Sequence, residues 1–274
     1  MQDISNWTPP TGPLGRLTKA AFERAEHLAS SLPELRARAR DAAPAPPFAD
    51  ALRVGGTVAV IAELKRRSPS KGVINADIRA GDRGRLYAEA GARALSVLTE
   101  PAEFGGSAGD LREVASRVAV PLLKKDFHVH VAQVWEARSL GASAMLFIAR
   151  ALAPGLLAAL VDEALEARVE PLIEIRSEDE LARAVATPAQ VIGVNARDLE
   201  TLVIDPTVTA RLIPAISGDR VRVAESGMST AGDVARAAAL GAHAVLIGSS
   251  LSLAPDPAAT LRALATVPRG AHAR

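Results

Sequence analysis

Hydrophobic and polar positions follow two alternating periods along most of this chain. From Thr57 onward we count eight short apolar runs of the kind that form buried strands. They are TVAVIAELK, RALSVLTE, VPLLKKDF, SAMLFI, EPLIEI, QVIGVN, RVRVAESG and HAVLIG. The segments between them, such as PGLLAALVDEALEAR and TAGDVARAAALGA, carry apolar residues at helical spacing. Several segments end in Gly-Ala, which is typical of a helix C-terminus that turns into a strand.

This alternation predicts parallel strands, because each return to the sheet crosses over through a helix. Eight such units over roughly 200 residues match a (β/α)8 barrel, the TIM barrel of the α/β class. A doubly wound open sheet would also alternate strands and helices. No Gly-x-Gly-x-x-Gly follows the first strand, which weakens the dinucleotide-binding version of that fold. We therefore favour the barrel.

The first 55 residues have a different pattern. GRLTKAAFERAEHLASSLPELRARARDAA is rich in Ala, Leu, Arg and Glu at helical spacing and is interrupted at Pro33. APAPPF then breaks the helical pattern, and FADALR predicts a short helix before the first strand. We expect residues 1–55 to form a helical extension packed on the barrel, and residues 56–274 to form the barrel, within a single domain.

Composition narrows the setting further. With 274 residues, 49% of them hydrophobic, the chain can bury a large core. A net charge of +1 gives no reason to expect nucleic acid or an anionic membrane as a partner. The absence of cysteine excludes disulfides, thiolate metal sites and a cysteine nucleophile. No signal-peptide pattern and no apolar stretch of about 18 residues is present, so we expect a soluble, cytoplasmic protein.

Charged and amide side chains recur where the predicted strands end. Glu63 and Lys65 lie two residues apart at the end of the first strand and so share a face. The same placement recurs at later strand ends, at Lys125, Glu174, Asn195 and Glu225. One such residue is usually a solvated edge. Together they would line the C-terminal mouth of a barrel, where charges shift each other's pKa as acid–base chemistry requires.

Two short stretches after the last two strands suggest a phosphate site. ESG at 225–227 and IGSS at 247–250 lie where barrels commonly bind phosphate through backbone N–H groups and a helix N-terminus. Gly227 and Gly248 permit close backbone approach, and Ser226 and Ser249 add hydroxyl donors. Ordinary strand-to-helix turns with capping serines are the structural alternative.

With these residues in place, the chain resembles the indole-3-glycerol phosphate synthase family of tryptophan biosynthesis. The most specific match is IAELKRRSPSKG, and the resemblance extends from about Phe48 to Leu264. Further matching stretches follow in order, namely LSVLTEPAEFGGS, LLKKDF, PLIEI, GVNARDL, AESGM and VLIGSSL. The N-terminal helices and HVHVAQ diverge from the family pattern.

The resemblance implies ring closure of carboxyphenylamino-deoxyribulose phosphate, with loss of carbon dioxide and then water, to give indole-3-glycerol phosphate. Lys125 matches the acid that protonates the ketone oxygen. Glu174 matches the carboxylate that removes a proton during dehydration, and Lys65 is a candidate second acid. The family positions that hold the lysines charged and orient the substrate hydroxyls are Glu63, Asn195 and Glu225.

Substrate-binding residues carry over in the same way. The phosphate cradle of the family matches Ser226, Gly227, Gly248 and Ser249, with Lys65 nearby. Arg197 and Ser68 match positions near the anthranilate carboxylate, where a guanidinium fork suits the anion. Phe104 and Phe127 match the apolar ring pocket, with core packing as the alternative.

The resemblance implies no cofactor and no metal, because the cationic ring intermediate is its own electron sink. His128 and His130 lie two apart, but no third ligand stands nearby, so we interpret them as surface or packing residues. The expected partner is the phosphorylated small-molecule substrate, with no nucleic acid and no membrane. We expect a monomer or weak homodimer that associates, if at all, with other tryptophan-pathway enzymes.

Three other functions are alternatives to this synthase activity. A Schiff-base aldolase on the same barrel would use Lys125 or Lys65 as a nucleophile with a lowered pKa. Phosphoribosylanthranilate isomerase relies on a cysteine base, which this chain lacks. A non-catalytic paralogue acting as an interaction domain should show decay at the strand ends, whereas the charged positions matched above are intact.

Overall fold

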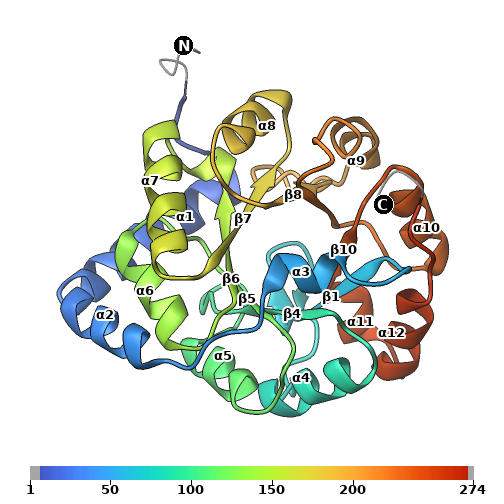
Figure 1. Ribbon diagram of the computed structural model, residues 1–274, viewed down its shortest axis with the longest axis horizontal. Coiled ribbons are helices and arrows are strands. Elements are labelled where there is room, and N and C mark those ends of the chain that lie inside the picture. The colour runs from blue at the N-terminus through green and yellow to red at the C-terminus, as the bar shows by residue number, and fades with distance from the viewer. Residues whose placement is uncertain (1–6, 271–274) are drawn as a thin grey trace.

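The computed structural model describes residues 7–270, in which eight parallel strands close into a barrel (Figure 1). The strands are β1 (Ala59–Leu64), β4 (Ala94–Leu98), β5 (Leu122–Lys125), β6 (Ala144–Ile148), β7 (Glu170–Ile175), β8 (Val191–Asn195), β9 (Val221–Glu225) and β10 (Ala244–Ile247). Each strand pairs in parallel with the next, and β10 closes the barrel against β1. Each falls within one of the predicted apolar runs. The predicted barrel is confirmed, and the open sheet is excluded.

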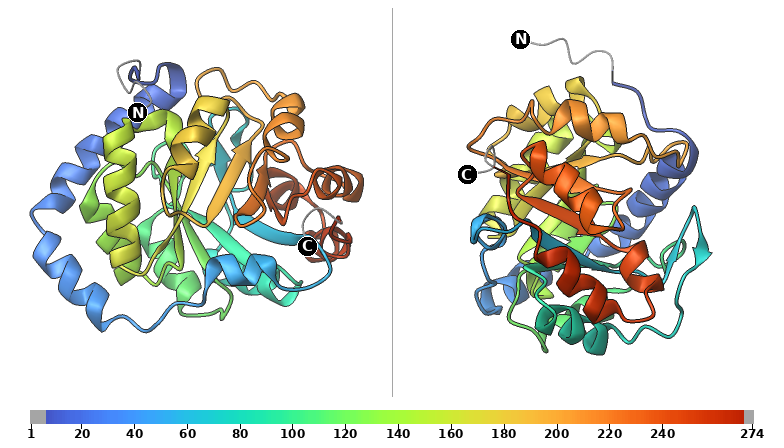
Figure 2. Two further views of the ribbon diagram at one scale, coloured as in Figure 1. Left: turned by 45° about the horizontal axis from the view of Figure 1, so that its top comes forward. Right: turned by 90° about the vertical axis from the view of Figure 1, so that its right-hand side faces the viewer.

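Helices surround the barrel on the outside (Figures 1 and 2). They are α4 (Ala80–Glu89), α5 (Ala108–Ala115), α6 (Val131–Ser139), α7 (Pro154–Glu166), α8 (Glu178–Val185), α9 (Pro206–Leu212), α10 (Ala231–Ala239), α11 (Ser249–Leu253) and α12 (Pro257–Ala265), with a 3-10 turn η2 (Ala149–Ala151). The strands are buried almost throughout, as expected for parallel strands covered on both faces.

The predicted Gly-Ala turns are confirmed at three helix ends. Gly91, Gly141 and Gly241 have φ values of 102°, 88° and 97°, in the left-handed region that glycine tolerates. The amide of the following alanine bonds the carbonyl oxygen five residues earlier in each case, as in Ala142 to Ala137 at 3.0 Å. This hydrogen bond caps the helix and turns the chain into the next strand.

Three helices precede the first barrel strand, namely α1 (Gly12–Ala29), α2 (Leu32–Asp41) and α3 (Phe48–Arg53). Pro33 lies in the first turn of α2, so the predicted interruption is confirmed, and α3 matches FADALR. α2 packs on α6, whereas α1 reaches the C-terminal end of the barrel, where Arg24 pairs with Asp126 at 2.7 Å.

A small antiparallel hairpin follows β1 and was not predicted as strands. It joins β2 (Arg67–Ser68) to β3 (Gly72–Val73) and carries the Ser-Pro-Ser segment at its turn. In the right-hand view of Figure 2 it lies at the same end of the barrel as α1. The preceding Arg66 forms a two-fold contact with Asp110, with both N–O distances 2.8 Å, which fixes the base of the hairpin to α5.

No helix within residues 7–270 combines the length and apolar character needed to cross a membrane.

Gly141→Ala should lower the free energy of unfolding by about 1–2 kcal/mol, the approximate cost of a left-handed conformation for an L-residue. The added Cβ would also meet the Cβ of Ala115 at 3.0 Å. Gly155→Ala is the matched control, because this glycine lies in α7 with nothing within 4 Å of an added Cβ. It should raise stability by about 0.4–1 kcal/mol. Urea unfolding of both variants tests the pair, and shifts of the same sign would contradict the backbone argument.

Candidate active site

Three carboxyl side chains from different strands point to the C-terminal end of the barrel interior. Glu63 on β1, Glu174 on β7 and Glu225 on β9 are each no more than 3% exposed. Two lysines face them. Lys65 Nζ lies 2.5 Å from Glu63 Oε1, and Lys125 Nζ lies 3.6 Å from Glu174 Oε2. The structure thus brings the predicted charged residues together in one mixed cluster.

The cluster keeps Lys125 charged. Burial alone would lower the pKa of Lys125, but the nearby carboxyls of Glu174, Glu225 and Glu63 more than offset this and raise it. Burial alone would raise the pKa of Glu63, but Lys65 and Lys125 hold it below its ordinary value. An ionised Glu63 therefore faces two ammonium groups.

Glu225 behaves differently from Glu63. Burial, and then the charge of neighbouring Glu174, raise the pKa of Glu225 well above its ordinary value. Two carboxyls in one dry site cannot both ionise without strong repulsion. The pKa of Glu225 is therefore raised by burial and by its carboxyl neighbours, while the charge of Lys125 opposes the rise.

Two glycines make room for this cluster. A Cβ on Gly193 would lie 2.1 Å from Glu225 Oε1, and a Cβ on Gly248 would lie 2.3 Å from Glu63 Oε1. Sequence reasoning missed Gly193. The available signal was a glycine inside the apolar run QVIGVN, which marks a close approach of another group. Gly248 was expected to face phosphate, and the structure gives it this additional role beside Glu63.

Lys124, the residue before Lys125, points away from the charged cluster. Lys124 alternates to the outer face of β5, where its Nζ lies 3.0 Å from Glu136 and 3.2 Å from His128. Burial and the charge of Lys124 lower the pKa of His128 to about 3, so the imidazole is neutral. His130 caps α6. Both histidines have structural contacts, as expected, and within residues 7–270 no three His, Cys, Asp or Glu side chains are placed to hold a metal ion.

A cavity of about 600 Å³ opens above the charged cluster. Its lining includes nine of the predicted residues, namely Lys65, Ser68, Phe104, Lys125, Phe127, Asn195, Arg197, Ser226 and Ser249. Glu63 and Glu225 are buried beneath the mouth. Gly227 instead lines an outer groove between α9 and α10, which it shares with Ser226.

The N-terminal helix supplies one wall of this cavity, which the sequence did not reveal. Pro13, Leu14 and Leu17 line it from α1. The apolar face of α1 predicts burial but gives no hint of what it covers. Leu14 N–H donates to the Leu199 carbonyl oxygen at 3.0 Å, which ties the helix to the loop after β8.

Two phenylalanines form an apolar side of the cavity. The ring centroids of Phe104 and Phe127 are 6.4 Å apart, with the rings tilted by 41°. Buried Glu100 holds the turn that carries Phe104 by accepting three backbone N–H groups, from Ala102, Glu103 and Phe104. The aromatic pair therefore stands on a fixed turn and can contact a planar ring.

Polar groups face the phenylalanines from the β8 side. Asn195 Oδ1 accepts the backbone N–H of Arg197 at 2.9 Å, and Arg197 Nη1 donates to the Leu202 carbonyl oxygen at 2.8 Å. An isolated antiparallel bridge between Arg197 and Ile204 closes this loop. The loop fixes a guanidinium at the cavity wall, where it suits a carboxylate.

The two serine motifs have different settings. Ser249 is the first residue of the short helix α11. Ser226 lies in the turn after β9, where Ser226 and Gly227 have φ values of 66° and 74°, and α10 begins only after its cap Thr230. Ser249 therefore lies at a helix N-terminus, whereas Ser226 lies in a turn before one. A left-handed serine is strained, and such strain is common at ligand-binding turns.

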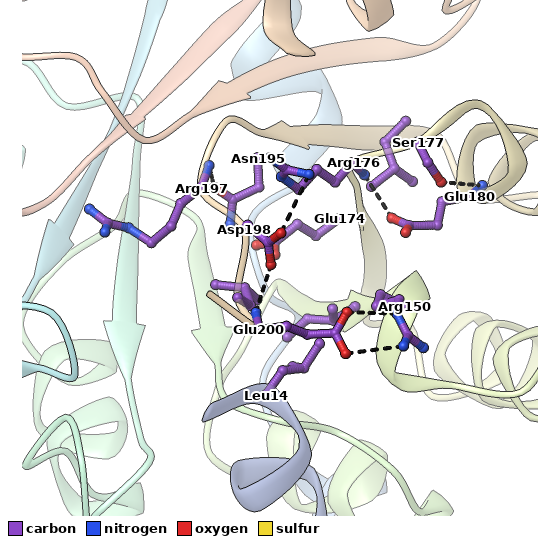
Figure 3. A pocket seen from close by; sticks show the side chains of 13 residues that line it. Leu14, Arg150, Glu174, Arg176, Ser177, Glu180, Asn195, Arg197, Asp198 and Glu200 are labelled. Carbon is purple, nitrogen blue, oxygen red and sulfur yellow. Dashed lines mark hydrogen bonds and ion pairs between the residues drawn. The ribbon is translucent and has the colours of Figure 1, made fainter. Parts of the chain in front are cut away.

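A second pocket of about 550 Å³ adjoins the first (Figure 3). The two share Leu14, Asn195, Arg197 and Leu199, and the second pocket also reaches Glu174. Its remaining lining is strongly charged, with Arg150, Arg176, Glu180, Asp198 and Glu200. Sequence reasoning found no sign of this pocket.

Comparison with known proteins identifies the family of this chain. A sequence model of the family "Indole-3-glycerol phosphate synthase" matches residues 17–264. A protein of that name from Opitutus terrae is 49% identical over 225 residues, covering 80% of this chain and 85% of the relative. Namesakes from Nocardioides sp. and Leifsonia xyli subsp. xyli are 46% and 43% identical, covering 87% and 92% of this chain and 92% and 97% of theirs.

Solved structures share the fold at low sequence identity. A mandelate oxidase structure is 18% identical, with a TM-score of 0.58, over 92% of this chain and 91% of its own. That similarity shows the barrel alone. The family match spans nearly the whole chain, and so this chain belongs to the indole-3-glycerol phosphate synthase family.

Proposed function

We propose that this chain converts carboxyphenylamino-deoxyribulose phosphate to indole-3-glycerol phosphate, as a decarboxylating carbon–carbon lyase of tryptophan biosynthesis. The observation that carries the proposal is the charged Lys125 at the base of the cavity, held among Glu63, Glu174 and Glu225. The substrate is a phosphorylated small molecule. We further propose a cytoplasmic setting and a monomer or weak homodimer, with other tryptophan-pathway enzymes as candidate partners.

Ring closure requires an acid at the ketone oxygen. Lys125 suits this role because its raised pKa keeps the proton on Nζ until negative charge develops on oxygen. Phe104 and Phe127 would contact the aromatic ring, and Arg197 with Ser68 would hold its carboxylate. This binding mode would bring the ring carbon against the ketone in a reactive geometry.

Decarboxylation needs little further help from the protein. Once the new carbon–carbon bond forms, the ring is cationic, and it accepts the electron pair released as carbon dioxide leaves. Dehydration then needs an acid for the hydroxyl and a base for the neighbouring carbon. Lys65, paired with Glu63 at 2.5 Å, is the proposed acid, and Glu174 is the proposed base.

Phosphate binding is assigned to the loops after β9 and β10. Ser226 and Ser249 line the same cavity as Lys65, although they lie on different strands' loops. Two hydroxyls and an ammonium therefore line the same cavity as the two phenylalanines. The lining thus offers groups for both the phosphate and the aromatic ring of the proposed substrate.

The geometry disfavours a Schiff-base aldolase. A nucleophilic lysine must be neutral, and enzymes achieve this by lowering its pKa. The pKa of Lys125 is raised, and Lys65 is paired with a carboxylate. Borohydride should therefore trap no adduct between this chain and its substrate, whereas covalent trapping on either lysine would favour the aldolase.

Indole fluorescence gives the direct test of the function. The purified chain should convert synthetic carboxyphenylamino-deoxyribulose phosphate to a fluorescent indole product without added cofactor. A non-catalytic paralogue would give no signal above the substrate control.

Lys125→Ala should lower kcat by about 10²–10⁴-fold, the usual contribution of a general acid. Substrate binding should change far less, because Phe104, Arg197 and the phosphate loops remain. Lys19→Ala, an exposed lysine on α1, is the control and should keep wild-type kcat. If Lys125→Ala retains more than about a third of the wild-type rate, another group is the acid.

Glu174→Gln should slow turnover strongly with a modest change in substrate affinity, because it keeps the shape and removes the base. Removing this negative charge should also lower the pKa of Glu225, which Glu174 now raises. Glu225 should then remain a counter-ion of Lys125 down to a lower pH. Measurement of kcat against pH checks the assignment. An unchanged rate and pH profile would reduce Glu174 to a hydrogen-bond acceptor.

Ser226→Ala and Ser249→Ala should each weaken phosphorylated substrate and product by roughly 10- to 150-fold, the loss of one hydrogen bond to a charged group at about 1.5–3 kcal/mol. A dephosphorylated analogue should bind almost equally to all three proteins. Inorganic phosphate should compete with substrate in the wild type and compete less well in both variants. Equal losses for both ligands would mean that the serines shape the mouth instead.

A further inference from the structure

The proposed reaction consumes a proton in every turnover. Ring closure places one proton on the ketone oxygen, and the departure of that oxygen as water requires a second. Formation of the indole double bond returns one proton from carbon. Carbon dioxide leaves without a proton, and its bonding electrons neutralise the ring. The balance is one proton taken up from solvent.

That proton has to reach Lys125 and Lys65 while bound substrate separates both lysines from solvent. Lys125 and Lys65 both line the main cavity, which the ring, the sugar chain and the phosphate would fill. Glu174 is different, because it lines the adjoining second pocket rather than the main cavity. Its Oε2 atom is buried and forms an ion pair with Lys125 Nζ at 3.6 Å, so the carboxyl links the second pocket to the lysine.

The second pocket is lined both by Glu174 and by more exposed charged residues (Figure 3). Glu174 is 3% exposed, whereas the rim residues Arg176 and Asp198 are 32% and 26% exposed in their side chains. Most of the lining is polar or charged, which suits water and not an aromatic ring. About 160 Å³ of the pocket can hold the centres of water molecules, which is ample for a chain of them.

Most charged side chains in this pocket are already paired. Arg150 holds Glu200 through two contacts of 3.1 Å, and Arg176 lies 3.7 Å from Asp198. Glu180, on the first turn of α8, is the remaining carboxyl of the lining besides Glu174. One of its oxygens, Oε2, accepts the Arg176 backbone N–H at 2.7 Å, which leaves its carboxyl anchored at the pocket wall.

We propose that the second pocket is the proton entry route and that Glu180 relays protons through pocket water to Glu174 and on to Lys125. The inference rests on the proposed function, because only that reaction consumes the proton. The O–H bond of the Glu180 carboxyl breaks as its proton passes to a water molecule on the Glu174 side. A new O–H bond forms with a proton from water on the solvent side, so the residue returns to its starting state in each cycle.

The electrostatic surroundings of Glu180 agree with this role. Burial raises its pKa above the ordinary value, hydrogen bonds from Arg176 and Ser177 and the charge of Arg183 oppose the rise, and Glu174 adds to it. The other charged groups that line the pocket are Arg150, Arg176, Arg197, Asp198 and Glu200. A raised pKa lets the carboxyl hold a proton at higher pH than an exposed glutamate would.

Glu180→Gln separates this role from a structural one. Glutamine keeps an oxygen for the Arg176 N–H and keeps the volume, but it cannot carry a proton. We expect kcat to fall about 10- to 100-fold, at or below the lower end for a residue that acts directly on substrate, with KM within about twofold. The solvent isotope effect on kcat should rise, because proton delivery becomes slower than the chemistry.

Two further variants sharpen the test. Glu180→Asp keeps a carboxyl and should retain more activity than Glu180→Gln. Formate should raise kcat of Glu180→Ala in proportion to its concentration and leave the wild type unchanged. Glu178→Gln is the matched control on the same helix, because this side chain is 62% exposed and pairs with Arg211 outside the pocket. It should keep wild-type kcat.

Three results would overturn the relay. One is a Glu180→Gln enzyme with wild-type kcat and isotope effect. Another is a higher KM with unchanged kcat, which would mean that the pocket holds part of the substrate. A third is loss of kcat in Glu180→Gln and Glu180→Asp alike with a matching loss of thermal stability, which would make Glu180 a helix cap only. If the wild type forms no indole product, the proposed function fails instead.

Discussion

Burial of charge at the C-terminal end of the barrel is the constraint on which the site depends. An ammonium taken out of water loses its proton unless anions replace the lost hydration. Lys125 remains charged because Glu63, Glu174 and Glu225 approach it from three different strands. The parallel register makes this possible, since it sets Asn195 beside Glu225 and Gly193 beside Glu174 at one level of the barrel. The charged lysine is thus a property of the closed sheet and not of any single loop.

Much of the fold could be predicted because eight buried runs alternate with amphipathic helices. Few folds are compatible with that pattern. The β2–β3 hairpin was missed because two-residue strands are too short to show a period. The charged cluster could be predicted because all its members end strands, and the C-terminal ends of parallel strands meet at one mouth. Gly193 was missed because its meaning depends on a carboxyl 32 positions later in the chain, and only the register brings the two together.

Residues that serve two purposes were the hardest to identify. Glu180 follows Ser177 by three positions and forms part of the cap of α8, so its sequence setting is fully explained by helix formation. Only the tertiary structure shows that Glu180 lines the same pocket as Glu174. Leu14 is similar, because an apolar residue on an amphipathic helix predicts burial without naming the surface that it covers. Local sequence patterns show the role of a residue within its own helix, and the tertiary structure shows its role in the site.

Burial of the charged cluster lowers the stability of the fold, and the rest of the barrel must offset this loss. Three buried carboxyls and a buried lysine would be replaced by apolar side chains in a barrel selected for stability alone, because well-packed hydrophobic groups commonly equal or exceed buried ion pairs. Here the repulsion among the three carboxyls raises the pKa of Glu225, and the charge of Lys125 opposes that rise. The apolar strands below supply the stability that the mouth lacks. Reactive charge at one end and continuous hydrophobic packing beneath it are therefore complementary features of the same eight strands.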